Sequence, residues 1–503
     1  MPSRTVLPAG VSSTSFARAL VELRKVVGPE HVLTDREALL PYEKLMLPAP
    51  ADEYMPSGAL LAATVEQVQG VLAVCGKYRV PLWPISTGRN FGYGGALPAT
   101  RGQLILDLKR MDRILEVDPV LATALVEPGV TYQQLHDHLA ERNLPLWLDF
   151  PGGGPLVGPL GNTLERGTGN TPYADHFAHA CGMEVVLADG RILRTGMGSL
   201  PDSRSWQAYR YGYGPYLDGL FTQSNFGVVT KLGLWLMPAP ASYRTILVQY
   251  SEDAALGRAV EAIRPLRLAG TIANPCALSN AALALTAYRR RAELYQDGGA
   301  TPDDVIVSAA RQHGIGAWNL TFTLYGTTEQ IAPNLDIVTR AFEMSGGRVD
   351  PDHHDPSQVS ELNLDAFRLL DWVGGGGLVW IAPVSASLGA DAARQRDIAR
   401  GVLGRHGFDY LAAPTVYGRD LHHVIALVFD RGDAEAMQRA RAAFRELAAA
   451  FLDNGYGLAR TGIDYMAALA NAYGETHRAV NRTLKRALDP NGILAPGKSG
   501  IRP

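Results

Sequence analysis

Cysteine, long apolar runs and an excess of charge of either sign are all scarce in this chain of 503 residues. Its three cysteines, Cys75, Cys181 and Cys276, lie far apart, which excludes a disulfide scaffold and a cysteine-rich metal site. No run of 18 apolar residues is present, so the sequence offers no candidate for a membrane-spanning helix. Lysine and arginine total 47 against 50 aspartates and glutamates, and no basic stripe indicates a nucleic-acid partner.

The remaining composition is that of a globular protein, with 47% hydrophobic and 19% charged residues. A chain of this length exceeds what one hydrophobic core supports, so two or more domains are expected. Residues 1–15 lack the apolar segment of a secretory signal, and the few cysteines fit a reducing compartment. We therefore expect a cytoplasmic protein without nucleic-acid or membrane partners.

A glycine-rich stretch at Pro84–Gly95, PISTGRNFGYGG, follows the apolar run Val80–Trp83, which is typical of a strand end. Glycines after a strand let backbone N–H groups approach a phosphate and permit positive φ, and Arg89 adds positive charge. The stretch matches neither G-x-G-x-x-G nor G-x-x-x-x-G-K-[ST]. It could therefore hold a diphosphate, but on its own it fits an ordinary turn better.

Several longer stretches accompany this loop. They are Val126–Tyr132 (VEPGVTY), Gly161–His176 (GNTLERGTGNTPYADH), Gly182–Pro238, Arg419–His423 (RDLHH) and Asp489–Gly500 (DPNGILAPGKSG). Together with the loop, and in order along the chain, they resemble the vanillyl-alcohol oxidase and 4-cresol dehydrogenase family. The resemblance implies an FAD-dependent oxidoreductase whose FAD-binding domain contains most of these motifs.

The resemblance also implies which residues contact FAD. They lie in the glycine loop, in the accompanying motifs and in the tail: Ser86, Thr87, Gly88, Arg89, Asn90, Gly92, Tyr93, Gly94, Pro128, Gly161, Asn162, Gly167, Gly169, Asp175, His176, Gly227, Val228, Arg460 and Lys498.

Periodicity predicts an α+β protein. Amphipathic or capped helices are expected at residues 13–27, 64–78 and 131–142, and a hairpin at 183–194 with Asp189-Gly190 as its turn. Strands and helices alternate between residues 243 and 454, including a long alanine-rich helix at Ser279–Tyr295, and a last helix covers 468–488. The predicted domains are an FAD-binding domain of the vanillyl-alcohol oxidase type (1–240), an α+β cap (241–454) and a C-terminal segment returning to the first domain (455–503).

Arg460 lies in the stretch Gly455–Thr461, GYGLART, after a predicted helix. A guanidinium facing the N1–C2=O edge of a flavin would stabilise the negative charge that develops when N5 accepts hydride. Sequence alone favours a surface arginine near a helix C-terminus. The resemblance places Arg460 on the family's catalytic arginine, and we adopt that interpretation.

Tyr93 is an unusual bulky residue inside the glycine loop, and it could pack in the core or present its hydroxyl to a substrate. In the family that the sequence resembles, a tyrosine here helps to bind the substrate as a phenolate. A phenolate pushes electron density toward its para carbon, so hydride leaves the benzylic carbon more readily. The product is a quinone methide, which water can attack.

Three positions depart from the family's pattern. Ala459 replaces the second phenolate-binding tyrosine, Gly152 stands where a carboxylate near flavin N5 is expected, and Asn170 replaces a tyrosine. Asp149 is present, but it lies three residues before Gly152. Loss of one phenolate donor and of the acid weakens the expected stabilisation of a simple 4-alkylphenol transition state, so either the substrate differs or other residues substitute.

The flavin linkage is a fourth departure. Leu378 falls at or next to the family's flavin-bearing histidine, and leucine cannot form that bond. Tyr417 or another cap tyrosine could still carry the flavin, as in the cresol dehydrogenases. Dissociable, non-covalent FAD is our first choice.

His422 and His423 stand side by side before an apolar strand. No carboxylate or cysteine lies at ligand spacing, so a metal site is not expected. The resemblance places one of them near the flavin or the substrate, and we choose His422 as catalytic with Tyr93 and Arg460. A buried structural histidine fits the pattern equally well.

The sequence therefore predicts an FAD-dependent enzyme that removes hydride from a benzylic-type C–H of a phenolic small molecule. O2 or an electron-acceptor protein would reoxidise it, and a homodimer is expected. Two alternatives remain: a biosynthetic dehydrogenase or cyclase acting on a larger or non-phenolic substrate, and a catalytically silent flavin-fold binding subunit.

Overall fold

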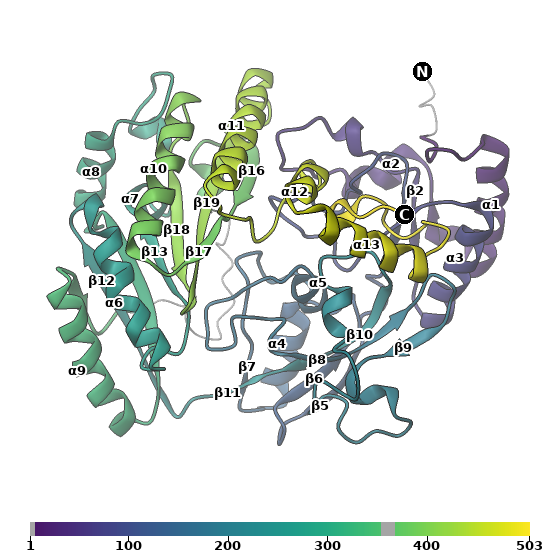
Figure 1. The fold of residues 1–503 in the computed structure, drawn as a ribbon, viewed down its shortest axis with the longest axis horizontal. Helices are drawn as coiled ribbons and strands as arrows, with labels where there is room; N and C mark the ends of the chain where they lie inside the picture. Colours follow the sequence, from purple (N-terminus) through teal and green to yellow (C-terminus); the bar gives the residue numbers. More distant parts are fainter. Residues whose placement is uncertain (1–5, 354–367) are drawn as a thin grey trace.

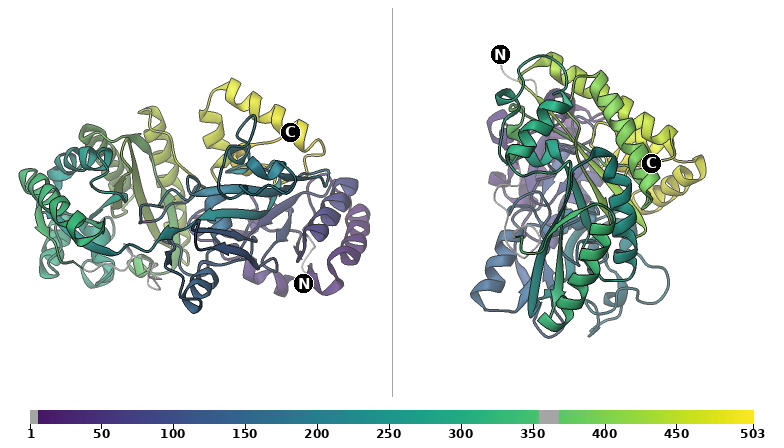
Figure 2. Two further views of the ribbon diagram at one scale, coloured as in Figure 1. Left: turned by 90° about the horizontal axis from the view of Figure 1, so that it is seen from below. Right: turned by 90° about the vertical axis from the view of Figure 1, so that its left-hand side faces the viewer.

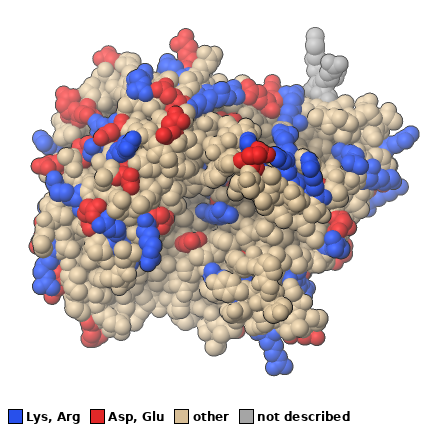
Figure 3. Space-filling view, viewed as in Figure 1, with Lys and Arg blue, Asp and Glu red and all other residues tan. Residues whose placement is uncertain are grey.

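The computed structural model describes residues 6–353 and 368–503, which form two lobes (Figure 1). One lobe contains the chain up to β11 (Met237–Pro238) and the tail after α11 (Ala434–Asp453). The other lobe contains the chain between them. Both charge signs are interspersed over the face in Figure 3, where a hollow separates the lobes. No helix among the described residues is long and apolar enough to cross a membrane.

The first sheet of the tail-bearing lobe positions the glycine loop. Its strand order is β1-β2-β4-β3, with β2, β4 and β3 parallel, and the loop follows β3. Successive residues of β3 face opposite ways. Leu82 packs in a core with the helices Ser13–Val27 and Val65–Tyr78, and Trp83 packs in a core with residues of the other lobe. The bounds are α1 (Ser13–Val27), β1 (Val32–Leu33), α2 (Arg36–Leu39), β2 (Gly58–Leu61), α3 (Val65–Tyr78), β3 (Leu82–Ile85) and β4 (Leu104–Asp107).

Local sequence signals account for the elements around this sheet. Ser12 and Thr64 cap α1 and α3 by accepting hydrogen bonds from backbone N–H groups, so the helices begin where the sequence predicts. Arg79 ends α3 in the left-handed conformation.

The second sheet is antiparallel, with strand order β5-β6-β10-β8-β9. The predicted hairpin is confirmed as β8 and β9, and Gly190 adopts φ 85° in its turn. Thr131 caps the predicted helix α4 through a capping box with Gln134. The bounds are β5 (Ile114–Asp118), β6 (Thr123–Val126), α4 (Tyr132–Glu141), β7 (Leu146–Trp147), α5 (Pro159–Leu164), β8 (Ala180–Val186), β9 (Ile192–Arg194) and β10 (Val228–Trp235).

The other lobe is one eight-stranded antiparallel sheet with helices on both faces (Figures 1 and 2). Its order is β15-β12-β14-β13-β18-β19-β16, and β17 also pairs with β19. Helices α6, α9, α10 and α11 pack on one face of this sheet, and α7 and α8 pack on the other face through a smaller hydrophobic core. The bounds are β12 (Ser242–Tyr250), α6 (Leu256–Leu268), β13 (Cys276–Asn280), α7 (Ala281–Leu285), α8 (Asp303–Gln312), β14 (Trp318–Gly326), α9 (Thr328–Met344), β15 (Arg348–Asp350), β16 (Gly376–Ile381), β17 (Val384–Ala386), α10 (Gly389–Arg405), β18 (Leu411–Val416) and β19 (Asp420–Asp430).

The long alanine-rich helix predicted at Ser279–Tyr295 is wrong. Residues up to Asn280 belong to β13, where Asn280 pairs with Trp318 of β14. The Asn280 side chain then caps α7, which ends after five residues at Leu285. Sheet pairing therefore removes Ser279 and Asn280 from the predicted helix, and the alanines that follow form only the short α7.

The C-terminal segment returns to the first lobe, as Figure 1 shows. Its single predicted helix is two helices, α12 (Met466–Ala472) and α13 (Glu475–Leu488). Lys485 of α13 is fully buried and lies 2.7 Å from the Asp489 carboxylate. Its ammonium also donates to the carbonyls of Asn225 and Leu494, at 2.8 and 2.7 Å. These contacts join α13 to the loop before β10 and to the last residues of the chain.

We expect Lys485→Met to lower the free energy of unfolding by about 3–5 kcal/mol, because it leaves the buried Asp489 carboxylate without its cation. Urea unfolding measures the change. Arg486→Met, on the exposed side of the same helix, is the matched control and should stay within about 0.5 kcal/mol of wild type. Equal effects of the two substitutions would contradict a stabilising role for the buried pair.

Candidate active site

A cavity of about 420 Å³ lies where the glycine loop, the residues around α5, the cap sheet and the C-terminal tail meet. This volume is typical of sites that bind small molecules or cofactors. Most of the predicted site residues line it: Ser86, Thr87, Gly88, Arg89, Asn90, Tyr93, Gly161, Asn162, Gly167, Gly227, Val228, His422, Arg460 and Lys498.

Six predicted cofactor residues are not among the lining residues: Gly92, Gly94, Pro128, Gly169, Asp175 and His176. Three of them, Gly92, Gly94 and His176, contact residues that line the cavity. A Cβ at Gly92 would collide with Trp380 and one at Gly94 with Ile463, so these glycines allow close packing against the cap sheet and the tail. His176 is buried, and its Nδ1 lies 2.5 Å from Oδ1 of Asn162, which does line the cavity.

The glycine loop and α5 approach each other closely at the cavity wall. Gly88 has φ 70°, a conformation that favours glycine. A Cβ at Gly161 of α5 would collide with the Ser86 hydroxyl, and one at Gly167 would collide with the Asn162 side chain. Larger residues at these positions would therefore fill the space in which a cofactor's phosphates could meet backbone amides.

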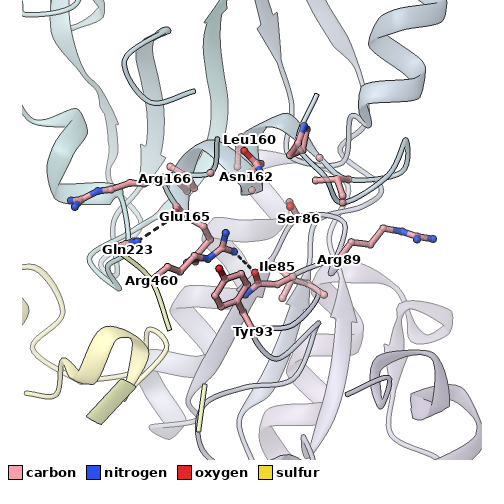
Figure 4. Close-up of a pocket in the computed structure, with 18 of the residues that line it drawn as sticks. Ile85, Ser86, Arg89, Tyr93, Leu160, Asn162, Glu165, Arg166, Gln223 and Arg460 are labelled. Atoms are coloured by element: carbon pink, nitrogen blue, oxygen red, sulfur yellow. Dashed lines mark hydrogen bonds and ion pairs between the residues drawn. The ribbon is translucent and has the colours of Figure 1, made fainter. Parts of the chain in front are cut away.

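A cluster of charged side chains meets at the inner wall (Figure 4). The Arg460 guanidinium carbon lies 4.2 Å from the ring centroid of Tyr93, and the same guanidinium donates to Oδ1 of Asn90. Its Nε lies 3.7 Å from the Glu165 carboxylate, which also accepts a hydrogen bond from Lys498. Arginine and tyrosine are therefore stacked beside the cavity, as a cation–π pair.

Burial and charge set the protonation of this cluster in opposite ways. Burial raises the pKa of Tyr93 above its ordinary value, against the opposing effect of Arg460. Burial alone would raise the pKa of Glu165 too, but Lys498 and Arg460 outweigh it and the pKa is lowered. Tyr93 is consequently a neutral hydroxyl at neutral pH, and Glu165 is an ionised carboxylate.

The sequence did not identify Glu165 or Gln223 as site residues. Gln223 adopts φ 45°, and its side-chain amide donates to the carbonyls of Glu165 and Ala459, at 3.2 and 3.1 Å. It therefore joins two wall segments that are more than 200 residues apart in the chain. Glu165 could have been noticed as the one acid in the GNTLERGTGN part of its motif, whereas nothing in the sequence indicates the role of Gln223.

The adjacent histidines point to different environments. His422 lines the cavity, with its Nε2 3.1 Å from the Asp420 carboxylate, and this hydrogen bond lowers the pKa of Asp420. His423 is fully buried 2.5 Å from the Tyr410 hydroxyl, and burial lowers its pKa to about 3. Within residues 6–353 and 368–503 no group of three or more histidine, cysteine or acidic side chains could hold a metal ion.

The positions that depart from the family's pattern leave space. Gly152 and Ala459 both line the cavity, and a Cβ at Gly152 would meet no atom within 4 Å. Asp149 does not fill the place of the missing acid, because its carboxylate lies behind the wall and accepts hydrogen bonds from the backbone of Asn170 and Thr171. The loss of the acid is therefore not compensated by its nearest carboxylate in sequence.

No histidine is placed to carry a flavin where the family has one. Leu378 is fully buried and is not among the lining residues. The two tyrosines in the described part of the wall are Tyr93 and Tyr417, and the Tyr417 hydroxyl is engaged at 3.0 Å with Oγ1 of Thr168. Burial raises the pKa of Tyr417 to about 12, so its hydroxyl is a neutral donor.

Two family models match the chain. Residues 56–196 match the FAD binding domain, and residues 385–499 match the C-terminal domain of FAD linked oxidases. The close approach of Gly161 to Ser86, and the cation Lys498 at the inner wall, fit such a cofactor.

Full-length relatives agree with these matches. The chain is 44% identical to the flavoprotein subunit of 4-cresol dehydrogenase (hydroxylating) from Pseudomonas putida, over 99% of this chain and 98% of that one. The crystal structure of p-cresol methylhydroxylase with substrate bound superimposes with a TM-score of 0.97 at 44% identity, covering 99% of both chains. The solved structure of 4-ethylphenol oxidase from Gulosibacter chungangensis, in its isoeugenol complex, gives a TM-score of 0.95 at 34% identity, again covering 99% of both chains.

Identity at this level along the whole chain, with the same two-lobed α+β fold, shows the relationship directly. The protein uses FAD and is an oxidase or dehydrogenase. It belongs to the vanillyl-alcohol oxidase and 4-cresol dehydrogenase family of FAD-linked oxidoreductases.

Proposed function

We propose that the enzyme removes hydride from the benzylic-type C–H of a phenolic small molecule. The observation that carries this proposal is the stacked pair of Arg460 and Tyr93 beside the cavity, with a cation and a neutral hydroxyl available to one phenolate oxygen. Bound FAD supplies the hydride acceptor. The names of the relatives, a 4-cresol dehydrogenase and a 4-ethylphenol oxidase, support a phenolic substrate class.

In this proposal Arg460 and Tyr93 divide the work of activating the phenol. Tyr93 donates its hydroxyl hydrogen to the phenolate oxygen, because its raised pKa keeps it protonated. Arg460 supplies the positive charge that favours ionisation of the phenol. It also stabilises the negative charge that develops in the site during hydride transfer. The phenolate then pushes electron density to the para carbon, and the oxidised product is a quinone methide.

His422 is the group that we assign to proton transfer. It is the one imidazole in the described part of the cavity wall, and Asp420 holds its Nε2 at 3.1 Å. With Nε2–H donated to the Asp420 carboxylate, Nδ1 of His422 can take the proton of a water molecule whose oxygen attacks the quinone methide.

We also propose how the chain divides the binding of FAD and substrate. Residues 1–240 and 455–503 would hold FAD through the glycine loop, α5 and the tail, and residues 241–454 would cover the substrate. The cavity-lining members of the predicted set would contact the cofactor, and Gly92, Gly94 and His176 would position the wall around it. O2 or an acceptor protein would take the electrons. The word "subunit" in the name of the P. putida relative favours a protein partner, whereas the 4-ethylphenol oxidase favours O2. The homodimer and the cytoplasmic location remain predictions.

FAD should be held without a covalent bond, because leucine occupies position 378 and the Tyr417 hydroxyl is engaged by Thr168. Acid precipitation of the purified protein should release yellow FAD into the supernatant. Fluorescent flavin that stays with the denatured polypeptide would contradict this prediction. In that case Tyr417→Phe would show whether this tyrosine is the site of attachment.

Arg460→Ala should slow flavin reduction roughly 10²- to 10³-fold while weakening FAD binding much less. The negative charges that Arg460 stabilises, on the ionised substrate and in the site during hydride transfer, are absent when oxidised FAD binds. Anaerobic stopped-flow absorbance measures the rate, and dialysis measures FAD retention. Arg445→Ala, at an exposed position of α11, is the control and should leave both unchanged. A wild-type reduction rate in Arg460→Ala would refute the assigned role.

The space at Gly152 and Ala459 should favour bulky para-substituted phenols over 4-cresol and vanillyl alcohol. Flavin reduction rates for a series of para substituents test this expectation. Ala459→Tyr should shift preference toward the small phenols, whereas Ala459→Phe adds the volume without the hydroxyl and should not restore their rates. The enlarged-pocket explanation fails if wild type oxidises vanillyl alcohol at least as fast as every bulky phenol.

A further inference from the structure

Glu165 occupies an unexpected place for an acid. It is the C-terminal cap of α5, and among the described residues that line the cavity it is the one carboxylate. Its backbone is held from both sides, since its N–H donates to the carbonyl of Gly161 and its own carbonyl accepts from Gln223. The side chain is about one-fifth exposed and reaches toward Arg460 (Figure 4). Its position is therefore fixed by the fold.

Two cations from distant parts of the chain converge on this carboxylate. Lys498, from the tail, is buried and hydrogen-bonded to one oxygen, and Arg460 lies 3.7 Å from the other. The other two arginines of the wall, Arg89 and Arg166, are exposed, and in Figure 4 they extend outward to either side. Solvent weakens the charges of those two, and Arg166 contributes least of the three cations that lower the pKa of Glu165, so the inner wall itself carries two cations and one anion.

A carboxylate at this position disfavours the hydride transfer that we propose for the site. Hydride transfer places new negative charge in the cavity, and a phenolate adds more, so Glu165 repels what the cations attract. An acid that only tied the tail to α5 could do so from behind the wall, as Asp489 does for Lys485. The placement of Glu165 between Lys498 and Arg460 instead makes the charge of the wall depend on it.

We propose that Glu165 sets the electrostatic balance of the site: it neutralises Lys498 and positions Arg460, so that the wall offers one net positive charge. This inference rests on the proposed role of Arg460 toward a phenolate and on the use of FAD. Glu165 is thus a positioning residue that acts through Arg460 and Lys498. Removing its charge while keeping its shape should increase the attraction of the site for anions.

Four proteins test how the net charge of the inner wall depends on Glu165 and Lys498: wild type, Glu165→Gln, Lys498→Met and the double variant. The first readout is the midpoint potential of the bound flavin at fixed pH. The second is the affinity for 4-nitrophenol, which is largely ionised in mildly alkaline buffer, compared with its neutral methyl ether, 4-nitroanisole. Flavin content and melting temperature establish folding, and Glu165→Asp keeps the carboxylate and should match wild type in both readouts.

Glu165→Gln should raise the potential and bind 4-nitrophenolate about tenfold more tightly, and Lys498→Met should lower the potential and bind it about tenfold more weakly. The double variant should return to wild-type values, and 4-nitroanisole should bind equally to all four. If Glu165→Gln does not fold, an unchanged potential and affinity in Lys498→Met would still overturn the proposal.

A lower potential and weaker 4-nitrophenolate binding in both single variants, with no recovery in the double variant, would overturn the inference and leave Glu165 a structural tie. If no variant binds 4-nitrophenolate but the potential follows the charge count, the inference about Glu165 stands and the phenolic function fails.

Discussion

The site depends on an ion-pair cluster at its inner wall, in which Glu165 meets Arg460 and Lys498. Ionised groups that are largely removed from water are unfavourable unless each has its partner, so the three must be brought together at once. They come from the end of α5, from the segment after α11 and from the last six residues of the chain. The fold therefore has to place three distant segments within a few ångströms.

Separate contacts hold each of these segments. The buried pair of Lys485 and Asp489 fixes the tail through the carbonyls of Asn225 and Leu494, four residues before Lys498. Gln223 joins the carbonyl of Glu165 to that of Ala459, next to Arg460. The cap sheet contributes Trp380, against which the glycine loop packs through Gly92. The shape of the cavity thus follows from contacts between segments that lie far apart in the sequence.

Local signals and long motifs were sufficient to predict much of this molecule. Ser12, Thr64 and Thr131 mark helix starts that depend only on neighbouring residues, and the Asp189-Gly190 turn fixes its hairpin in the same local way. The glycine loop and the accompanying motifs led to FAD and the family.

The features that the sequence did not predict depend on tertiary contacts. The helix predicted at Ser279–Tyr295 is shortened because Ser279 and Asn280 pair with β14, and the α7 that follows ends after five residues. Glu165 has its role only because Lys498 reaches it from the other end of the chain. The division of His422 and His423 between cavity and core follows from the alternation of β19, and sequence reasoning left it open.

The central claim is that the cation and hydroxyl at this wall activate a phenol by binding its oxygen as an anion. The most direct measurement is anaerobic bleaching of the flavin by a 4-alkylphenol and by the methyl ether of the same compound. The two ligands have the same benzylic C–H, but the ether cannot ionise. The account predicts that the phenol bleaches the flavin and the ether does not. Equal bleaching by both, or bleaching by neither for any para substituent, would contradict it.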